Sequence, residues 1–274
     1  MPVGESDATI DHAARVRGAW LGRISGCMLG KPVEMLSMMS GRVALDAYLA
    51  DAGVTELRDY VPYLADSGVA GLLPNACLGG ITCAIPDDDI NYTVLALMLL
   101  EERGFDFTTD DVGRAWLRYL PGGMTFTAER EAYARMLADV GMGFTFGAPP
   151  EFDLAECSDN PFNDWIGAQI RADLYGWVAP GQPELAAELA RRDAALSHRD
   201  EGVYGAQFVA AAGAGLAGGA SNGATVGALW GLTGRPIPTH WTEPWDGRVQ
   251  VTLAGVGELD VDDLVHRTLA VRPA

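Results

Sequence analysis

Three consecutive aspartates, Asp87, Asp88 and Asp89, come directly before a run of residues that is almost wholly apolar, from Tyr92 to Leu100. Such a run predicts a buried helix, so three carboxylates would lie at its N-terminus. The helix dipole stabilises a carboxylate there by only about 0.3–1 kcal/mol. Two carboxylates about 4 Å apart repel each other by roughly 4 kcal/mol at an effective dielectric constant near 20. We therefore expect either a bound cation or side chains that separate into solvent.

Two interpretations of this aspartate trio stay open on the segment alone. In the first, one aspartate caps the helix and the others point into water, which is a common start for a helix. In the second, the three carboxylates converge on a metal ion. Carboxylate oxygens are hard ligands that favour Mg²⁺, Mn²⁺ or Ca²⁺ over Zn²⁺, so one of those ions is expected if a metal is bound.

The composition favours a globular protein and argues against two classes of partner. A chain of 274 residues with 49% hydrophobic and 20% charged residues is long enough to bury about three-quarters of its extended surface in one core. We expect one domain, comprising residues 1–274. The 37 acidic and 19 basic residues give a formal net charge of −18, which opposes binding to nucleic acid and to anionic membranes. We therefore expect neither as a partner.

The cysteines and the N-terminus indicate a cytoplasmic protein. The four cysteines show no CxxC spacing, and reduced thiols are expected, although a disulfide between Cys77 and Cys83 stays open. The acidic N-terminus is not that of a signal peptide. An uncharged stretch from Gly202 to Gly234 has the length of a membrane span, but it is rich in Gly and Ala and is broken by a polar turn. Two buried helices are therefore expected there.

The hydrophobic period predicts an all-α fold, which we expect to be a single compact multi-helix orthogonal bundle with long connecting loops. A Pro- and Gly-rich loop from Val61 to Ile85 leads to the aspartate trio. In the first helix a glycine recurs at every fourth position from Gly18 to Gly30, which indicates that another backbone or a ligand lies close against that face; tight helix packing is the favoured explanation. Besides the helix after the trio, the expected helices are 10–29, 109–119, 128–138, 165–178, 184–196, 202–217, 224–232 and 261–269.

Two segments resemble the ADP-ribosylglycohydrolase family, the group that includes dinitrogenase-reductase-activating glycohydrolase. Residues 18–34 look like the opening helix of the family and its Gly-Asp-x-x-Gly turn, with Cys27 where the family usually has aspartate and Glu34 matching a later acid. Residues 87–93 resemble the signature Thr-Asp-Asp-Thr-x-Met-Thr, and the last two aspartates of the trio fall on its metal-binding aspartates.

Two further segments, 163–171 and Ser197-His198, are similar to the helix start that lines the substrate cleft of the family and to its Thr-His step. The resemblance implies ADP-ribose or an ADP-ribosylated substrate as the ligand. Plainer roles stay open: a helix cap for Asp164 and for Asn222, an ion pair with Asp173 or another surface acid for Arg171, and a structural role for His198. The candidate substrate-binding residues are Asn163, Asp164, Gly167, Arg171, His198 and Asn222.

The mechanism that the resemblance implies uses one or two Mg²⁺ or Mn²⁺ ions, which grip the ribose hydroxyls and orient a water. Asp88 and Asp89 would be metal ligands, Asp87 a third ligand or an outer neighbour, and Ser221 a hydroxyl ligand. Glu34 would be the base or a bridging ligand, unless it is only a solvated acid in a loop after Pro32. The candidate catalytic residues are Glu34 and Asp88, since a carboxylate must accept the proton of the water.

The C-terminal part departs from the pattern of the family. Residues 218–227 read Gly-Gly-Ala-Ser-Asn-Gly-Ala-Thr-Val-Gly, whereas family members carry Gly-Gly-Asp-Thr-Asp before a hydroxyl residue. Half of the binuclear metal site that the resemblance implies is therefore missing. The leading hypothesis is a hydrolase of ADP-ribose glycosides, with impaired activity as one form of it. The alternatives are a non-catalytic protein that binds a cation or a nucleotide, and a purely structural use of the same scaffold.

Overall fold

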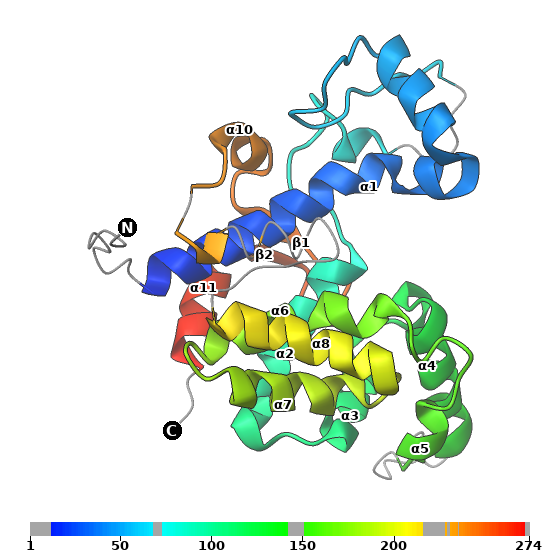
Figure 1. The fold of residues 1–274 in the computed structure, drawn as a ribbon, viewed down its shortest axis with the longest axis vertical. Coiled ribbons are helices and arrows are strands. Elements are labelled where there is room, and N and C mark those ends of the chain that lie inside the picture. The colour runs from blue at the N-terminus through cyan, green and yellow to red at the C-terminus, as the bar shows by residue number, and fades with distance from the viewer. Residues whose placement is uncertain are drawn as a thin grey trace, which may run out of the picture.

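The structure is a computed structural model that describes residues 12–67, 73–141, 151–215, 228, 231–234 and 236–271. In chain order its elements are α1 (His12–Asp51), η1 (Pro74–Ala76), α2 (Asp88–Arg103), η2 (Gly104–Asp106), α3 (Thr109–Tyr119), η3 (Gly122–Met124), α4 (Thr127–Val140), α5 (Leu154–Cys157), η5 (Ile166–Arg171), α6 (Asp173–Val178), α7 (Pro183–Ala194), α8 (Asp200–Gly215), α10 (Thr239–Thr242), η6 (Glu243–Trp245), β1 (Arg248–Gln250), β2 (Glu258–Asp260) and α11 (Val261–Ala270). Helices predominate, so the prediction of an all-α fold is confirmed. Figure 1 shows the long helix α1 crossing the molecule above a group formed by α2, α6, α7 and α8.

Helix α1 is longer than the sequence predicts, because it continues through Pro32 to Asp51 instead of ending near Leu29. Its backbone leaves helical geometry at Gly41, whose φ of 72° is accessible to glycine without a Cβ clash. Packing stabilises the extension, since it contributes to a small hydrophobic cluster apart from the main core, made of Leu36, Tyr48 and Val61. Glu34 therefore lies on a helix, and its expected position in a loop is wrong.

Helix α2 is buried along most of its length, as the apolar run predicts. Nearly all side chains from Ile90 to Leu100 are buried, and the apolar ones belong to the main hydrophobic core. Each fully buried aliphatic side chain contributes about 1.5–3 kcal/mol. α2 packs against α3, η5 and α6, while α8 packs against α6 and α7. At the N-terminus of α2, Asp87 is buried, whereas Asp88 and Asp89 are half-buried.

The other predicted helices match the structure to different degrees. α3 has the predicted bounds and is capped by Thr108 in a reciprocal capping box. The single helix predicted over 165–178 is wrong, because η5 and α6 are separate elements on either side of Ala172. Arg171 and Asp173 flank this break and form ion pairs in two different buried clusters. These ion pairs outweigh the helical propensity of the segment. The helix predicted over 224–232 falls mostly outside the described residues.

The C-terminal segment supports the loop that leads to the trio. β1 and β2 pair antiparallel, with Val249 opposite Leu259. The backbone of Ala84 bonds to β1 on both sides, accepting from Gln250 N at 2.9 Å and donating to Arg248 O at 2.8 Å. The side chain of Asn91 in α2 also bonds to Thr252. The start of α2 is thus fixed by residues far away in the sequence.

Close backbone packing explains one position of the glycine stripe. A Cβ added to Gly18 would lie 2.6 Å from the carbonyl oxygen of Gly231, so the packing interpretation is confirmed there. At Gly30 an added Cβ would have no described atom within 4 Å. All four cysteines are free thiols, and the disulfide left open between Cys77 and Cys83 does not form.

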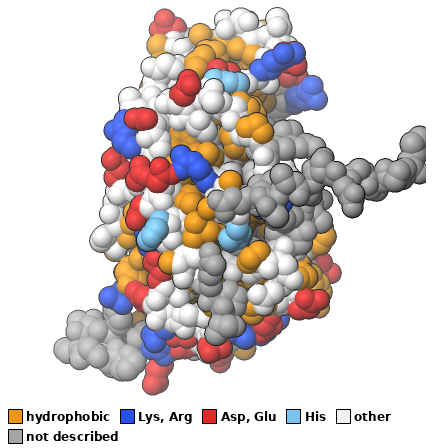
Figure 2. Space-filling view, turned by 90° about the vertical axis from the view of Figure 1, so that its left-hand side faces the viewer, with side chains coloured by type: hydrophobic (Ala, Val, Ile, Leu, Met, Phe, Trp, Pro, Cys, Tyr) orange, Lys and Arg blue, Asp and Glu red, His pale blue; other side chains and the backbone are white. Residues whose placement is uncertain are grey.

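Two observations concern the outer surface. Among the described residues, no helix combines the length and the apolar character that crossing a membrane requires. On the face shown in Figure 2, basic side chains are scattered among acidic and hydrophobic ones. This face therefore presents a mixed surface.

Candidate metal site

The aspartate trio lies at the N-terminus of α2, and its carboxylates converge. Asp87 is the N-cap, and its Oδ1 accepts a hydrogen bond from the backbone N–H of Asp89 at 3.1 Å. One carboxylate oxygen from each of the three aspartates lies within 4.8 Å of the other two. The side chain of Asp89 is 22% exposed, and its Oδ1 is buried without a hydrogen-bond partner. The capping interpretation is thus correct for Asp87, but the remaining carboxylates do not separate into solvent.

The start of α11 shows the other arrangement in the same protein. Asp260 caps this helix through the backbone N–H of Asp262, in the way that Asp87 caps α2. The side chains of Asp262 and Asp263, however, are 68% and 53% exposed, and each pairs with an arginine near the surface. Among the residues that the structure describes, the trio is the one group of three or more Asp, Glu, His or Cys side chains whose ligand atoms converge in this way.

Full ionisation of the trio is unfavourable without added positive charge. Burial, followed by the charge of Asp87, raises the pKa of Asp88 to about 7. Burial also raises the pKa of Asp89 to about 7, although the charge of Arg23 opposes it. Burial acts in the same direction on Asp87, but the charge and hydrogen bond of Lys31 outweigh it and lower the pKa of Asp87. A divalent cation between the carboxylates would favour their ionised form.

Two cations from α1 flank the trio. The ammonium of Lys31 forms an ion pair with Oδ2 of Asp87. Arg23 is fully buried; its guanidinium donates to the carbonyl oxygen of Asp89, from Nε at 3.1 Å and from Nη2 at 2.6 Å. It also pairs with the carboxylate of Asp173 and donates to the carbonyl oxygen of Ile170. Arg23 thereby joins α1, the first turn of α2, and the segment formed by η5 and α6.

Two further residues of α1 lie near the trio. Glu34 is exposed and lies one turn after Lys31, and its charge is among those that raise the pKa of Asp88. Cys27 lies one turn before Lys31. Burial, followed by the charge of Asp87, holds the pKa of the Cys27 thiol well above its ordinary value. The predicted catalytic carboxylate Glu34 thus acts on the charge of Asp88 from the helix that carries Lys31, and the thiol of Cys27 is uncharged.

Asn163 and Asp164 lie in the turn that precedes η5. Asn163 is half-buried, and its carbonyl oxygen accepts a hydrogen bond from the backbone N–H of Arg199 at 2.9 Å. Asp164 is exposed. Its expected role as a helix cap is wrong, because the N-cap of η5 is Trp165 and no side chain caps that helix. Both residues remain predictions for substrate binding.

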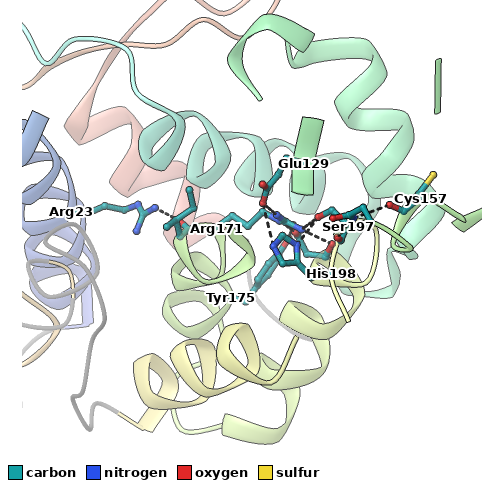
Figure 3. Close-up of polar contacts among 10 residues, drawn as sticks. Arg23, Glu129, Cys157, Arg171, Tyr175, Ser197 and His198 are labelled. Atoms are coloured by element: carbon teal, nitrogen blue, oxygen red, sulfur yellow. Dashed lines mark hydrogen bonds and ion pairs between the residues drawn. The ribbon is translucent and has the colours of Figure 1, made fainter. Parts of the chain in front are cut away.

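Arg171 lies in a buried cluster of charged and polar groups, shown in Figure 3. Its Nη1 donates to Oε1 of Glu129 at 2.7 Å, its Nε pairs with Asp193, and its Nη2 donates to Ser197 Oγ at 2.9 Å. Gly167 packs against the same glutamate, because a Cβ added there would lie 2.3 Å from Oε1 of Glu129. We name these residues, together with Tyr175 and His198, the Arg171 cluster. The ion-pair interpretation of Arg171 is correct, although its partners are Glu129 and Asp193 and both are buried.

His198 is also buried in the Arg171 cluster. Its Nδ1 lies 2.8 Å from Ser197 Oγ, and its Nε2 lies 3.8 Å from Oε1 of Glu129 and has no hydrogen-bond partner. Burial, followed by the charge of Arg171, lowers the pKa of His198 to about 3. The imidazole is therefore neutral at physiological pH and supports the fold from inside. Its predicted contact with a substrate remains a prediction.

Sequence reasoning missed Arg23 and Lys31 as partners of the trio. Arg23, Cys27 and Lys31 are spaced four residues apart, so they share one face of α1. Two basic residues on a helix face that is otherwise apolar could have indicated buried acidic partners. Lys31 is also the single lysine of the chain. Glu129 and Asp173 carried no comparable signal, because their partners are distant in sequence. Ser221 and Asn222 lie outside the described residues.

The residues present fit a hard divalent cation. Three carboxylates supply oxygen ligands, and a buried oxygen of Asp89 is left without a hydrogen bond. Oxygen donors of this kind suit Mg²⁺ and Mn²⁺. The site differs from an ordinary acidic helix start, since a carboxylate oxygen of Asp89 is removed from water and accepts no hydrogen bond, with only the guanidinium of Arg23 3.5 Å away.

Comparison with known proteins gives one family. A sequence model of the ADP-ribosylglycohydrolase family matches residues 8–222. The chain therefore belongs to the ADP-ribosylglycohydrolase family. Its membership suggests glycosidase-type hydrolysis of ADP-ribose compounds, and the family is generally dependent on divalent metals. No curated protein matches the chain, and no solved structure matches it.

Proposed function

We propose that this protein is a divalent-metal-dependent hydrolase that cleaves ADP-ribose, through an N- or O-glycosidic bond, from a modified protein side chain or a small acceptor. The observation that carries the proposal is the convergence of the trio at a buried helix N-terminus. Mg²⁺ or Mn²⁺ is the proposed cofactor, with Asp88 and Asp89 as its principal ligands. Membership of the family supports the choice of ADP-ribose as the substrate.

Each residue near the trio has a role in this mechanism. When bound, a divalent ion would supply Lewis acidity toward the ribose hydroxyls and the attacking water. Glu34, which is exposed on α1 one turn after Lys31, accepts the proton of that water. The negative charge of Asp88 favours a transition state with oxocarbenium character at the anomeric carbon. Asp87 remains bonded to Lys31 and fixes the first turn of α2.

The proposed substrate cleft extends to the turn before η5. Asn163, Asp164 and Gly167 are proposed to bind the substrate from this segment, with Asn222 and Ser221 added on the strength of the sequence pattern. Arg23 supports this arrangement, because it bonds both to the carbonyl oxygen of Asp89 and to that of Ile170. Arg171 and His198 would support substrate binding indirectly, because their buried contacts hold η5 in place.

A second candidate function is binding of ADP-ribose or of a cation without turnover. The observation that favours it is the sequence of residues 218–221, Gly-Gly-Ala-Ser, where the resemblance leads us to expect an Asp-Thr-Asp element. Two metal ligands would then be missing from the second half of the site. Either function is proposed for a single domain in the cytoplasm, in keeping with four free thiols. A net charge of −18 opposes nucleic acid and anionic membranes as partners.

Release of ADP-ribose tests the proposal. Peptides carrying ADP-ribosylated arginine or serine are incubated with the protein and Mn²⁺ or Mg²⁺, and free ADP-ribose is quantified by chromatography. We expect release that depends on the metal and is reduced at least about 100-fold in Asp88→Asn and in Glu34→Gln. Asp262→Asn, at the exposed start of α11, is the matched control and should keep wild-type activity. ADP-ribose binding without release from either peptide would favour the second candidate.

A further inference from the structure

We propose that Lys31 is an internal counterion of the trio, which holds Asp87 and restricts the site to a single divalent cation. The proposal rests on the metal site of the proposed function and goes beyond it, because it assigns the number of ions and the residue that sets this number. The observation that carries it is the ion pair between Lys31 Nζ and Asp87 Oδ2.

Both oxygens of Asp87 are engaged by donors of the protein itself. Oδ1 accepts the capping hydrogen bond from Asp89 N at 3.1 Å, and Oδ2 faces the ammonium of Lys31. The side chain of Lys31 is 19% exposed and that of Asp87 is 6% exposed. A metal ion that approached Oδ2 would have to displace the ammonium from a half-buried position. Asp87 is therefore the least available ligand of the trio.

Arg23 occupies the opposite flank of the trio. It is fully buried, and its Nη2 lies 3.5 Å from Oδ1 of Asp89. Asp88 lies between these flanks, and no ion pair joins it to a basic side chain of the described residues. Five carboxylates, those of the trio, Glu34 and Asp173, thus face two cations of the protein. One divalent ion would offset two of the three negative charges in excess.

A second divalent ion would be placed against the ammonium of Lys31. A charge of +2 and a charge of +1 about 6 Å apart repel each other enough to weaken binding about tenfold even at the dielectric constant of water. The repulsion is stronger where water is partly excluded. Lys31 should therefore weaken binding of the first ion by at least this factor, and a second ion would in addition meet the repulsion of the first. As the single lysine of the chain, Lys31 is also the one side-chain amine, so that amine labelling adds only the α-amino group of the N-terminus.

Calorimetric titration with Mn²⁺ tests the proposal on the full chain. We expect one ion per wild-type chain, and binding at least about tenfold tighter in Lys31→Met, which removes the charge. Lys31→Arg keeps the charge and should stay within about threefold of the wild type. Equal or weaker binding by Lys31→Met, or two ions per wild-type chain, would overturn the proposal. Circular dichroism verifies that each variant is folded, and Lys31→Gln serves as a second neutral variant.

A second measurement uses the wild-type protein and needs no substitution. Reductive methylation with ¹³C-formaldehyde labels the ammonium of Lys31 and preserves its charge. Its methyl resonance should shift on titration with Mg²⁺ and saturate at the calorimetric affinity, because the ion binds beside it. A resonance that does not move while Mg²⁺ binds would contradict the proposal.

The outcomes separate this inference from the proposed function. If the wild type binds Mn²⁺ and the neutral variants bind it equally well, the proposal about Lys31 is wrong and the proposed metal site stands. If the neutral variants bind Mn²⁺ and the wild type does not, Lys31 is confirmed as a counterion and the metal-dependent function of this chain is lost. If none of the proteins binds Mn²⁺ or Mg²⁺, both proposals are wrong.

Discussion

The Arg171 cluster and the aspartate trio, taken with its neighbours Arg23 and Lys31, are two groups of acidic and basic side chains that reach opposite electrostatic outcomes. In the Arg171 cluster the guanidinium lies between Glu129 and Asp193 and bonds to both carboxylates. In the trio the two cations lie at the flanks, and Asp88 has no ion pair with a described basic side chain. Both groups contain a fully buried arginine, so the difference lies in where the cation is placed.

This difference separates a group that stabilises the fold from one that is suited to bind a cation. Buried charges are tolerated where hydrogen bonds and opposite charges satisfy them within the protein. Tyr175 and Ser197 add further hydrogen bonds to the Arg171 cluster. Each group keeps one buried atom without a hydrogen bond, Nε2 of His198 in the Arg171 cluster and Oδ1 of Asp89 in the trio, but only in the trio is that atom a carboxylate oxygen. A bound cation would neutralise the excess negative charge of the trio, whereas the carboxylates of the Arg171 cluster are already paired with Arg171.

The largest expected effect is in the Arg171 cluster. Arg171→Met should lower the free energy of unfolding by about 3–5 kcal/mol, because it leaves two buried carboxylates without their cation. Urea denaturation measures this loss. Arg191→Met is the control, since Arg191 pairs with Glu188 at the surface and exposed pairs contribute only about 0–1 kcal/mol. A loss below about 1 kcal/mol in Arg171→Met would remove the contrast between the two groups.

The pH dependence of the free energy of unfolding should reveal the contribution of His198. Burial and Arg171 lower its pKa from 6.5 to about 3 in the folded protein, so between these values the unfolded chain binds a proton that the folded chain does not. Stability is therefore lost as pH falls from about 6.5 toward 3. Between pH 7 and pH 4.5 the free energy of unfolding of His198→Asn should fall by about 2–3 kcal/mol less than that of the wild type, as measured by urea denaturation. Parallel losses in both proteins would show that His198 does not contribute.

A smaller effect of opposite sign is expected at the trio. The pKa of Asp88 is raised from 3.8 to about 7 in the metal-free protein, so the folded state holds a proton that the unfolded state has released, and stability is lost as pH rises through about 7. With EDTA at pH 8, Asp88→Asn should raise the free energy of unfolding by about 1–2 kcal/mol, a value reduced for solvent exposure. Asp262→Asn, the control, should change it by less than about 0.5 kcal/mol. Destabilisation by Asp88→Asn would contradict the assignment of excess negative charge to the trio.

Local patterns predicted that the trio lies at the start of a buried helix, and long-range contacts determine its electrostatics. The apolar run after the trio and its capping aspartate specify α2 by local physical chemistry, and α3 is predictable for the same reason. Lys31 reaches Asp87 across 56 positions, and Arg23 reaches Asp89 across 66. No period or spacing within the segment of the trio encodes these partners.

Tertiary ion pairs also changed the local structure. The break at Ala172 divides a segment whose pattern is helical throughout, because its flanking residues Arg171 and Asp173 enter different buried clusters. The extension of α1 past Pro32 depends likewise on packing against Val61 and its neighbours. Sequence reasoning therefore placed the carboxylates correctly and assigned Arg171 to the substrate, whereas the structure gives Arg171 two buried carboxylates as partners.

Binding of a divalent cation by the trio is the central claim, and isothermal titration of the metal-free protein with Mn²⁺ and Mg²⁺ tests it most directly. We expect one ion to bind to the wild type and to Asp262→Asn with the same affinity, and we expect no binding to Asp88→Asn. Absence of binding to the wild type, or full affinity in Asp88→Asn, would contradict the account.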